Sequence, residues 1–159
     1  MNRYLICSDI HGNLSDFKRA LREAGRDPID GVIIAGDMEL DQSDIQLAVS
    51  SLKRDGKPVS LYMVKGNCDY GYGGDLRDLA TIQLPDNITC VLSHGHRYQV
   101  KSDLMIYAEV ARNLGAKIAI DPINTNVVEE VKKNITVPVT VKIRKGFDGG
   151  NVNAVEMAR

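Results

Sequence analysis

The stretch Tyr4-Leu5-Ile6-Cys7-Ser8-Asp9-Ile10-His11-Gly12 joins a short apolar run to a polar cluster. The same arrangement recurs where residues 32–35 precede Gly36-Asp37, residues 60–64 precede Gly66-Asn67-Cys68-Asp69, and residues 89–92 precede Ser93-His94-Gly95-His96. Short, β-branched runs followed by turn residues are typical of buried strands. The pattern predicts an α/β protein whose polar clusters lie just beyond the C-terminal ends of its strands, where open α/β sheets place their sites.

Helix and strand patterns alternate between and after these runs. Asn13 is predicted to cap the first helix, which ends at Gly25. The predicted helices cover residues 14–24, 43–52, 76–80 and 102–114, and the second has an apolar face of Ile45, Leu47, Ala48 and Leu52. Residues 81–84 and 88–92 predict an antiparallel hairpin joined by a Pro-Asp-Asn turn, and residues 117–120 predict another strand.

Size and composition indicate one domain in a reducing compartment. The chain has 159 residues, a net charge of −1 and three scattered cysteines. Such cysteine spacing favours a reduced, cytoplasmic protein, in which Cys7 and Cys90 are buried. Cys68 lies inside the third cluster and is not expected to ligate a metal through its thiolate. No apolar stretch reaches about 18 residues, so no membrane partner is expected. The near-neutral charge gives no indication of a nucleic-acid partner, and a homo-oligomer is left open.

The clusters together predict a metal site. Asp9 and His11 alternate in an extended Asp-x-His, so we expect them to face the same way and share one ion. The Asp37 carboxylate has two oxygens and can bridge two ions, while Asn67 offers an amide oxygen and His94 an imidazole. Each residue alone is as compatible with a turn or a surface position, and coincidental turn chemistry is the alternative for the whole set.

Residues 1–120 resemble the calcineurin-like metallophosphoesterases, specifically the small bacterial and archaeal phosphodiesterases. The motifs Asp-x-His, Gly-Asp, Gly-Asn-x-Asp and His-Gly-His are present through the metal-ligand candidates Asp9, His11, Asp37, Asn67 and His94, with Asp69 and His96 as companions. The resemblance implies a two-layer β-sandwich flanked by helices. It also implies two divalent ions, Mn²⁺ first and Ni²⁺, Zn²⁺, Fe or Mg²⁺ as alternatives, which activate water for hydrolysis of a phosphate ester of a small molecule or nucleotide. Asn67, His96 and Asp69 are the candidate catalytic residues.

The final Gly-His-Thr-His motif of that family is missing. The chain instead has Asp121-Pro122-Ile123-Asn124-Thr125-Asn126, and no histidine follows His96. Losing one imidazole from each ion should weaken metal binding. An oxygen of Asp121 or Asn124 is a weaker replacement. An impaired phosphoesterase is therefore weighed against a catalytically degraded binding scaffold with the same fold.

Residues 121–159 are similar to a fragment of the tRNA-dihydrouridine synthases, most clearly over residues 137–148. The resemblance implies that Lys142 matches a flavin-contacting lysine, which leaves an FMN- or tRNA-related role as a remote alternative. One strand and two helices cannot close a barrel, so a colourless protein without flavin is expected. We expect a metallophosphoesterase-like domain over residues 1–120 and a foreign-looking segment over 121–159, with residues 137–143 pairing onto the sheet.

Overall fold

The computed structural model describes residues 2–72, 74–100, 102–103 and 105–122. Apart from residues 121 and 122, the predicted foreign segment and its strand at 137–143 lie outside the described residues. Both remain predictions.

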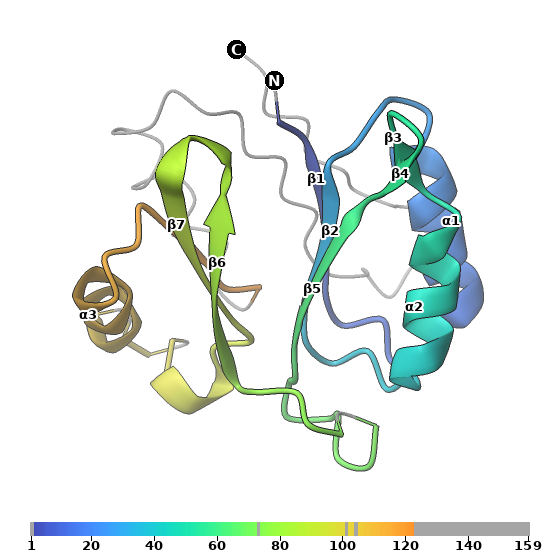
Figure 1. The fold of residues 1–159 in the computed structure, drawn as a ribbon. Helices are drawn as coiled ribbons and strands as arrows, with labels where there is room; N and C mark the ends of the chain where they lie inside the picture. Colours follow the sequence, from blue (N-terminus) through green and yellow to red (C-terminus); the bar gives the residue numbers. More distant parts are fainter. Residues whose placement is uncertain (1, 73, 101, 104, 123–159) are drawn as a thin grey trace.

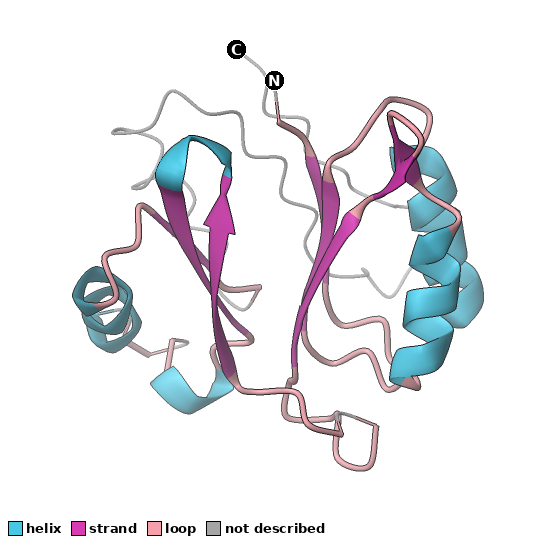
Figure 2. Cartoon of the chain, in the orientation of Figure 1, coloured by secondary structure: helices cyan, strands magenta, loops and turns pink. Residues whose placement is uncertain are grey.

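Two three-stranded sheets pack face to face between layers of helix (Figures 1 and 2). In the first sheet, β1 (Tyr4–Cys7), β2 (Gly31–Ala35) and β5 (Ser60–Val64) run parallel in the order β1-β2-β5. In the second, β6 (Leu79–Leu84) pairs antiparallel with β7 (Ile88–Ser93), which pairs parallel with β8 (Ile118–Ile120). Helices α1 (Leu14–Ala24) and α2 (Gln42–Ser50) cover the first sheet, and α3 (Met105–Asn113) covers the second. The predicted helix-flanked β-sandwich is confirmed.

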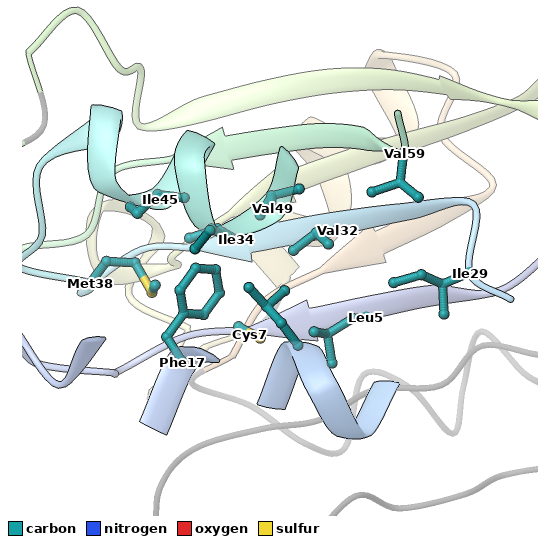
Figure 3. Packing of buried hydrophobic residues seen from close by; sticks show 12 residues of the cluster. Leu5, Cys7, Phe17, Ile29, Val32, Ile34, Met38, Ile45, Val49 and Val59 are labelled. Atoms are coloured by element: carbon teal, nitrogen blue, oxygen red, sulfur yellow. The ribbon is translucent and has the colours of Figure 1, made fainter. Parts of the chain in front are cut away.

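The alternation of side chains along β2 builds two separate hydrophobic layers. Val32 and Ile34 face α1 and α2, where they meet the fully buried Phe17 (Figure 3). Ile33 and Ala35 face the second sheet and belong to the core between the two sheets. Burying a large apolar side chain stabilises the fold by about 1.5–3 kcal/mol. Because β2 is buried on both faces, the loop that follows it starts from a fixed position.

Helix α1 has the predicted boundaries. The Asn13 side chain accepts a hydrogen bond from the backbone N–H of Asp16 at 3.0 Å, which satisfies a free donor of the first turn. Gly25 follows the last helical residue and its N–H donates to the Leu21 carbonyl. The loop between β1 and α1 is therefore held at both ends.

Helix α2 differs from its prediction. It ends at Ser50, and Leu47, expected on the apolar face, is 72% exposed. The chain instead enters a small hairpin of β3 (Lys53–Arg54) and β4 (Lys57–Pro58). Asp55 and Gly56 turn it with φ values of 52° and 77°, which is the Asp-Gly signature of a tight hairpin. The sequence pattern predicted a helix over residues 43–52 and no hairpin after it.

Two further helix predictions need correction. No helix forms over residues 76–80, because Leu79 and Ala80 pair with Ser93 and Leu92 in the second sheet. Helix α3 begins at Met105, after Asp103, whose Oδ1 accepts from the Met105 N–H at 2.8 Å. Cys7 and Cys90 are buried as predicted. Among the described residues, no helix combines the length and apolar character needed to cross a membrane.

Candidate metal centre

Four loops bring the polar clusters together at one end of the sandwich. They follow β1, β2, β5 and β7, and Figure 1 shows the loops after β2 and β5 at the same end of the sheets. Three of these strands are parallel neighbours, so their C-terminal ends share one sheet edge. The side chains that meet there form two groups of candidate ligands, Asp9 with Asp37 and His94, and His11 with Glu39 and Cys68.

The first group, called here the buried cluster, consists of Asp9, Asp37 and His94. One ligand atom from each lies within 4.8 Å of the others. His94 is 2% exposed, and its Nδ1 lies 2.7 Å from the Ala35 carbonyl oxygen, which can only accept. Nδ1 therefore carries a proton, and Nε2 faces Asp37 Oδ2, 3.3 Å away. This is the arrangement in which a histidine is oriented for metal ligation.

In the buried cluster, Asp37 and His94 stabilise each other's charged forms. Burial alone would raise the pKa of Asp37, but the hydrogen bonds from His94 and from the Cys68 backbone N–H outweigh it and lower the pKa to about 2. Burial alone would lower the pKa of His94, but the contacts with Asp37 and Ala35 raise it. Asp37 is thus a carboxylate at neutral pH, and a bound cation would take the place of the His94 proton.

The second group, called here the exposed cluster, consists of His11, Glu39 and Cys68. Their ligand atoms also lie within 4.8 Å of one another. His11 Nδ1 is 3.3 Å from Glu39 Oε2, and His11 Nε2 is 3.9 Å from Asp9 Oδ1, so His11 links the two clusters. Its side chain is 49% exposed. Burial, followed by the nearby Asp37 carboxylate, raises the pKa of Cys68 to about 11, so the metal-free protein holds a thiol there.

The candidate ligands predicted from the sequence did not include Glu39. Glu39 follows Asp37 by two residues, as His11 follows Asp9 by two, and this parallel was the available signal. Each of the four residues has a positive φ, at 53° for Asp9, 49° for His11, 54° for Asp37 and 49° for Glu39. Non-glycine residues are uncommon in this left-handed region, and each such position costs about 1–3 kcal/mol.

The extended Asp-x-His predicted from the sequence is therefore wrong in its backbone. Asp9 and His11 do lie close, but left-handed residues rather than strand alternation bring their side chains to one side. Cross-loop hydrogen bonds hold this backbone in place. Asp9 N–H donates to Gly36 O at 3.1 Å and His11 N–H donates to Asp37 O at 3.1 Å. The loops after β1 and β2 thus align each pair of candidate ligands beside the other.

Asp69 lies behind the loops and holds them together. Its Oδ2 accepts from the N–H groups of Asp37 at 2.8 Å and Gly66 at 2.7 Å, and its Oδ1 accepts from the N–H of Glu39 at 2.9 Å. Both oxygens of this buried carboxylate are engaged by backbone amides. The geometry gives Asp69 a positioning contact with both clusters, whereas its assignment as a catalytic residue stays a prediction.

The other candidates lie around this centre. Asn67 is exposed and its Nδ2 is 3.2 Å from Cys68 Sγ. His96 stands on a short 3₁₀ helix (His96–Tyr98), with its ring centroid 5.6 Å from that of His94 and its Nε2 3.8 Å from Asp78 Oδ1. Asp121 is buried beneath Gly95, where an added Cβ would lie 2.5 Å from Asp121 Oδ1. In the described part of the chain, neither His96 nor Asp121 belongs to either ligand cluster.

The donor set suits divalent cations. Three carboxylates, two imidazoles and one thiol meet in the two clusters. Within the described residues, the ion pairs of Asp9, Asp37 and Glu39 are to histidines alone. Such a site holds surplus negative charge that a cation can neutralise, and oxygen with imidazole ligands suits Mn²⁺, Fe²⁺ and Zn²⁺.

Solved structures with this fold include a conserved protein of Streptococcus pneumoniae TIGR4, described as a predicted phosphoesterase. It shares 19% identity with this chain, with a TM-score of 0.58 and coverage of 74% of this chain and 59% of that one. A single mutant of Vps29 from Entamoeba histolytica shares 22% identity, with a TM-score of 0.55 and coverage of 74% and 62%. Vacuolar Protein Sorting 29 from Cryptosporidium parvum shares 17% identity with this chain, with a TM-score of 0.54. The match covers 76% of this chain and 63% of that one.

At these identities the likeness concerns the fold, and this chain spans about three fifths of the length of those proteins. No curated protein matches the sequence significantly. The sequence profile described as calcineurin-like phosphoesterase matches residues 2–132, which includes every residue of both clusters. This chain therefore belongs to the calcineurin-like phosphoesterase family.

Proposed function

We propose that this chain is a metal-dependent phosphoesterase that hydrolyses phosphate monoesters or diesters of small molecules or nucleotides in the cytoplasm. The observation that carries the proposal is the buried cluster, in which the His94 Nδ1 is fixed by Ala35 and the Nε2 is presented beside Asp37. Buried titratable groups gathered at the carboxyl ends of parallel strands are typical of a working site. Family membership supports hydrolysis as the chemistry.

The chain's own residues divide the work. Asp9, Asp37 and His94 would hold one ion, and His11 would contribute to a second. Two bound divalent ions, Mn²⁺ first, would supply Lewis-acid charge for phosphate and lower the pKa of a water nucleophile. The Asn67 amide is exposed, and its second N–H can donate to a phosphate oxygen while the first donates to Cys68 Sγ. His96 is our candidate for orienting the leaving group.

The second candidate function is a binding scaffold without turnover. No histidine follows His96, so the imidazoles expected from the final family motif are missing. Two of the similar structures are Vps29 proteins, whose name describes vacuolar protein sorting. This alternative requires the fold and its loops but neither bound metal nor catalysis.

An assay with bis-p-nitrophenyl phosphate and added Mn²⁺ separates the two. We expect slow turnover that Asp37→Asn abolishes, because that change removes the carboxylate nearest the His94 Nε2. Asp103→Asn is the matched control, since this carboxylate is exposed and contacts only the start of α3 among its described hydrogen bonds. Absence of turnover together with less than one ion per chain would contradict the enzyme and favour the scaffold.

A further inference from the structure

We propose that Glu39 and Cys68 join His11 as the ligands of the second ion, and that the sulfur makes this position prefer zinc and other thiophilic divalent ions. The inference rests on the metal dependence of the proposed function and deepens it. The buried cluster would keep its oxygen and nitrogen ligands, so the two positions would differ in the metal they prefer.

Backbone hydrogen bonds to Asp37 and Asp69 fix the exposed cluster. The Glu39 N–H donates to Asp69 Oδ1 at 2.9 Å, the Cys68 N–H donates to Asp37 Oδ1 at 2.8 Å, and the His11 N–H donates to Asp37 O at 3.1 Å. The backbones of all three proposed ligands are therefore bonded to Asp37 or Asp69. Ligands held in this way lose less conformational freedom when an ion binds.

The three side chains also meet as a chemically complete set. Carboxylate, imidazole and sulfur donors lie within 4.8 Å of one another. His11 Nδ1 and Glu39 Oε2 are 3.3 Å apart, which is close enough for one ion to contact both atoms. Side-chain exposures of 49% for His11 and 32% for Glu39 leave a path for an ion from solvent. Glu39 thus adds a carboxylate to the imidazole and sulfur of this cluster.

The surroundings of Cys68 suit a metal-bound sulfur. Asn67 Nδ2 lies 3.2 Å from Cys68 Sγ and can donate a hydrogen bond to it. Donors of this kind stabilise negative charge on ligand atoms. On binding, the sulfur–hydrogen bond is replaced by a sulfur–metal bond and the thiol proton leaves to solvent, with no change of oxidation state. Sulfur, nitrogen and oxygen ligands together suit Zn²⁺, Cd²⁺ and Co²⁺ better than Mn²⁺ or Mg²⁺.

A titration of the reduced protein with Co²⁺ tests this directly, with equilibrium dialysis to count bound ions. We expect a sulfur-to-cobalt charge-transfer band in the near ultraviolet that Cys68→Ser removes. Cys7 and Cys90 stay in that variant as buried thiols and serve as internal controls. Glu39→Gln should keep the band and weaken Co²⁺ binding about tenfold or more. Circular dichroism of each variant, with Cys68→Ala as a second replacement, verifies the fold.

The outcomes separate this inference from the proposed function. Co²⁺ that binds without the band, or a band that persists in Cys68→Ser, overturns the sulfur site and leaves the buried cluster and the phosphoesterase proposal standing. No Co²⁺, Zn²⁺ or Mn²⁺ bound at all overturns both. Loss of the band in both Cys68 variants, with the fold intact, supports the inference.

Discussion

The buried and exposed clusters use the same loops but differ in how firmly their side chains are held. In the buried cluster, His94 is 2% exposed and its ring is oriented by a 2.7 Å hydrogen bond to Ala35. In the exposed cluster, the His11 side chain is 49% exposed, and its ion pairs are to Asp9 and Glu39. One position is pre-organised by the core between the sheets, whereas the other depends on loop backbone. We expect the buried cluster to bind its ion more tightly.

The largest expected effect on stability and metal binding comes from Gly66→Ala, which disturbs both clusters. An added Cβ would overlap the Asp37 carboxylate and lie 2.5 Å from the Asp37 nitrogen. Steric overlap with a group held on both sides should cost about 3 kcal/mol in the free energy of unfolding, and metal binding should be lost. Urea denaturation and metal titration measure the two effects.

Gly56→Ala is the control for this substitution. Gly56 has a φ of +77° and no atom within 4 Å of an added Cβ. The substitution therefore measures the cost of backbone strain alone, without steric overlap. We expect a cost of about 1 kcal/mol and unchanged metal binding. If Gly66→Ala costs no more than Gly56→Ala, the close approach of the two loops is not what holds the site together.

Asp69→Asn is expected to have the next largest effect and to act on both clusters. The new amide would replace one oxygen with a donor, which leaves at least one of the Asp37, Glu39 and Gly66 N–H groups without its acceptor. A buried unsatisfied donor costs about 1–3 kcal/mol. Denaturation and Co²⁺ titration provide the measurement, with Asp103→Asn as the exposed control. Stability equal to that of the control would show that Asp69 does not hold the loops.

A comparison of His94→Gln with His11→Gln tests the difference between the clusters. Both variants lose an imidazole. The His94 ring is already oriented by its hydrogen bond to Ala35, whereas the half-exposed His11 side chain must lose conformational freedom when the ion binds. We expect the loss of Mn²⁺ affinity to be about tenfold greater for His94→Gln, which corresponds to about 1.4 kcal/mol. Isothermal titration calorimetry measures both. Equal losses would contradict the distinction between the two clusters.

The smallest effect is expected for His96→Gln. Its ring lies near that of His94 but belongs to neither cluster among the described residues. Mn²⁺ affinity should change by less than about 0.5 kcal/mol, whereas turnover should fall if His96 orients the leaving group. The affinity is measured by calorimetry and the turnover by the phosphodiester assay. A large loss of metal would place His96 among the ligands.

The sequence was informative where local pattern and tertiary structure agree. The run before Asp9 predicted β1 because its apolar residues are contiguous, and Asn13 predicted the start of α1 because its side chain caps the first turn. The pattern over residues 76–80 failed because pairing with β7 overrides local helix preference. The prediction that Leu47 lies on the apolar face of α2 was wrong, because residues two apart, such as Ile45 and Leu47, do not share a helix face.

The candidate site was predictable in its residue types but not in its geometry. Residue type and motif spacing alone identify Asp9, His11, Asp37 and His94 as candidate ligands. Glu39 was missed because its role depends on a left-handed backbone at four positions, and this conformation follows from hydrogen bonds between loops far apart in sequence. Side-chain type can be read locally, whereas such cross-loop bonds cannot.

Anomalous diffraction from crystals grown with Mn²⁺ and Zn²⁺ tests the central claim most directly. We expect one peak within coordination distance of Asp9, Asp37 and His94 Nε2, and a second, zinc-rich peak beside His11, Glu39 and Cys68. Crystals with no peak at Asp37, in which His94 Nε2 keeps its 3.3 Å contact with Asp37 Oδ2 at full metal concentration, would contradict it.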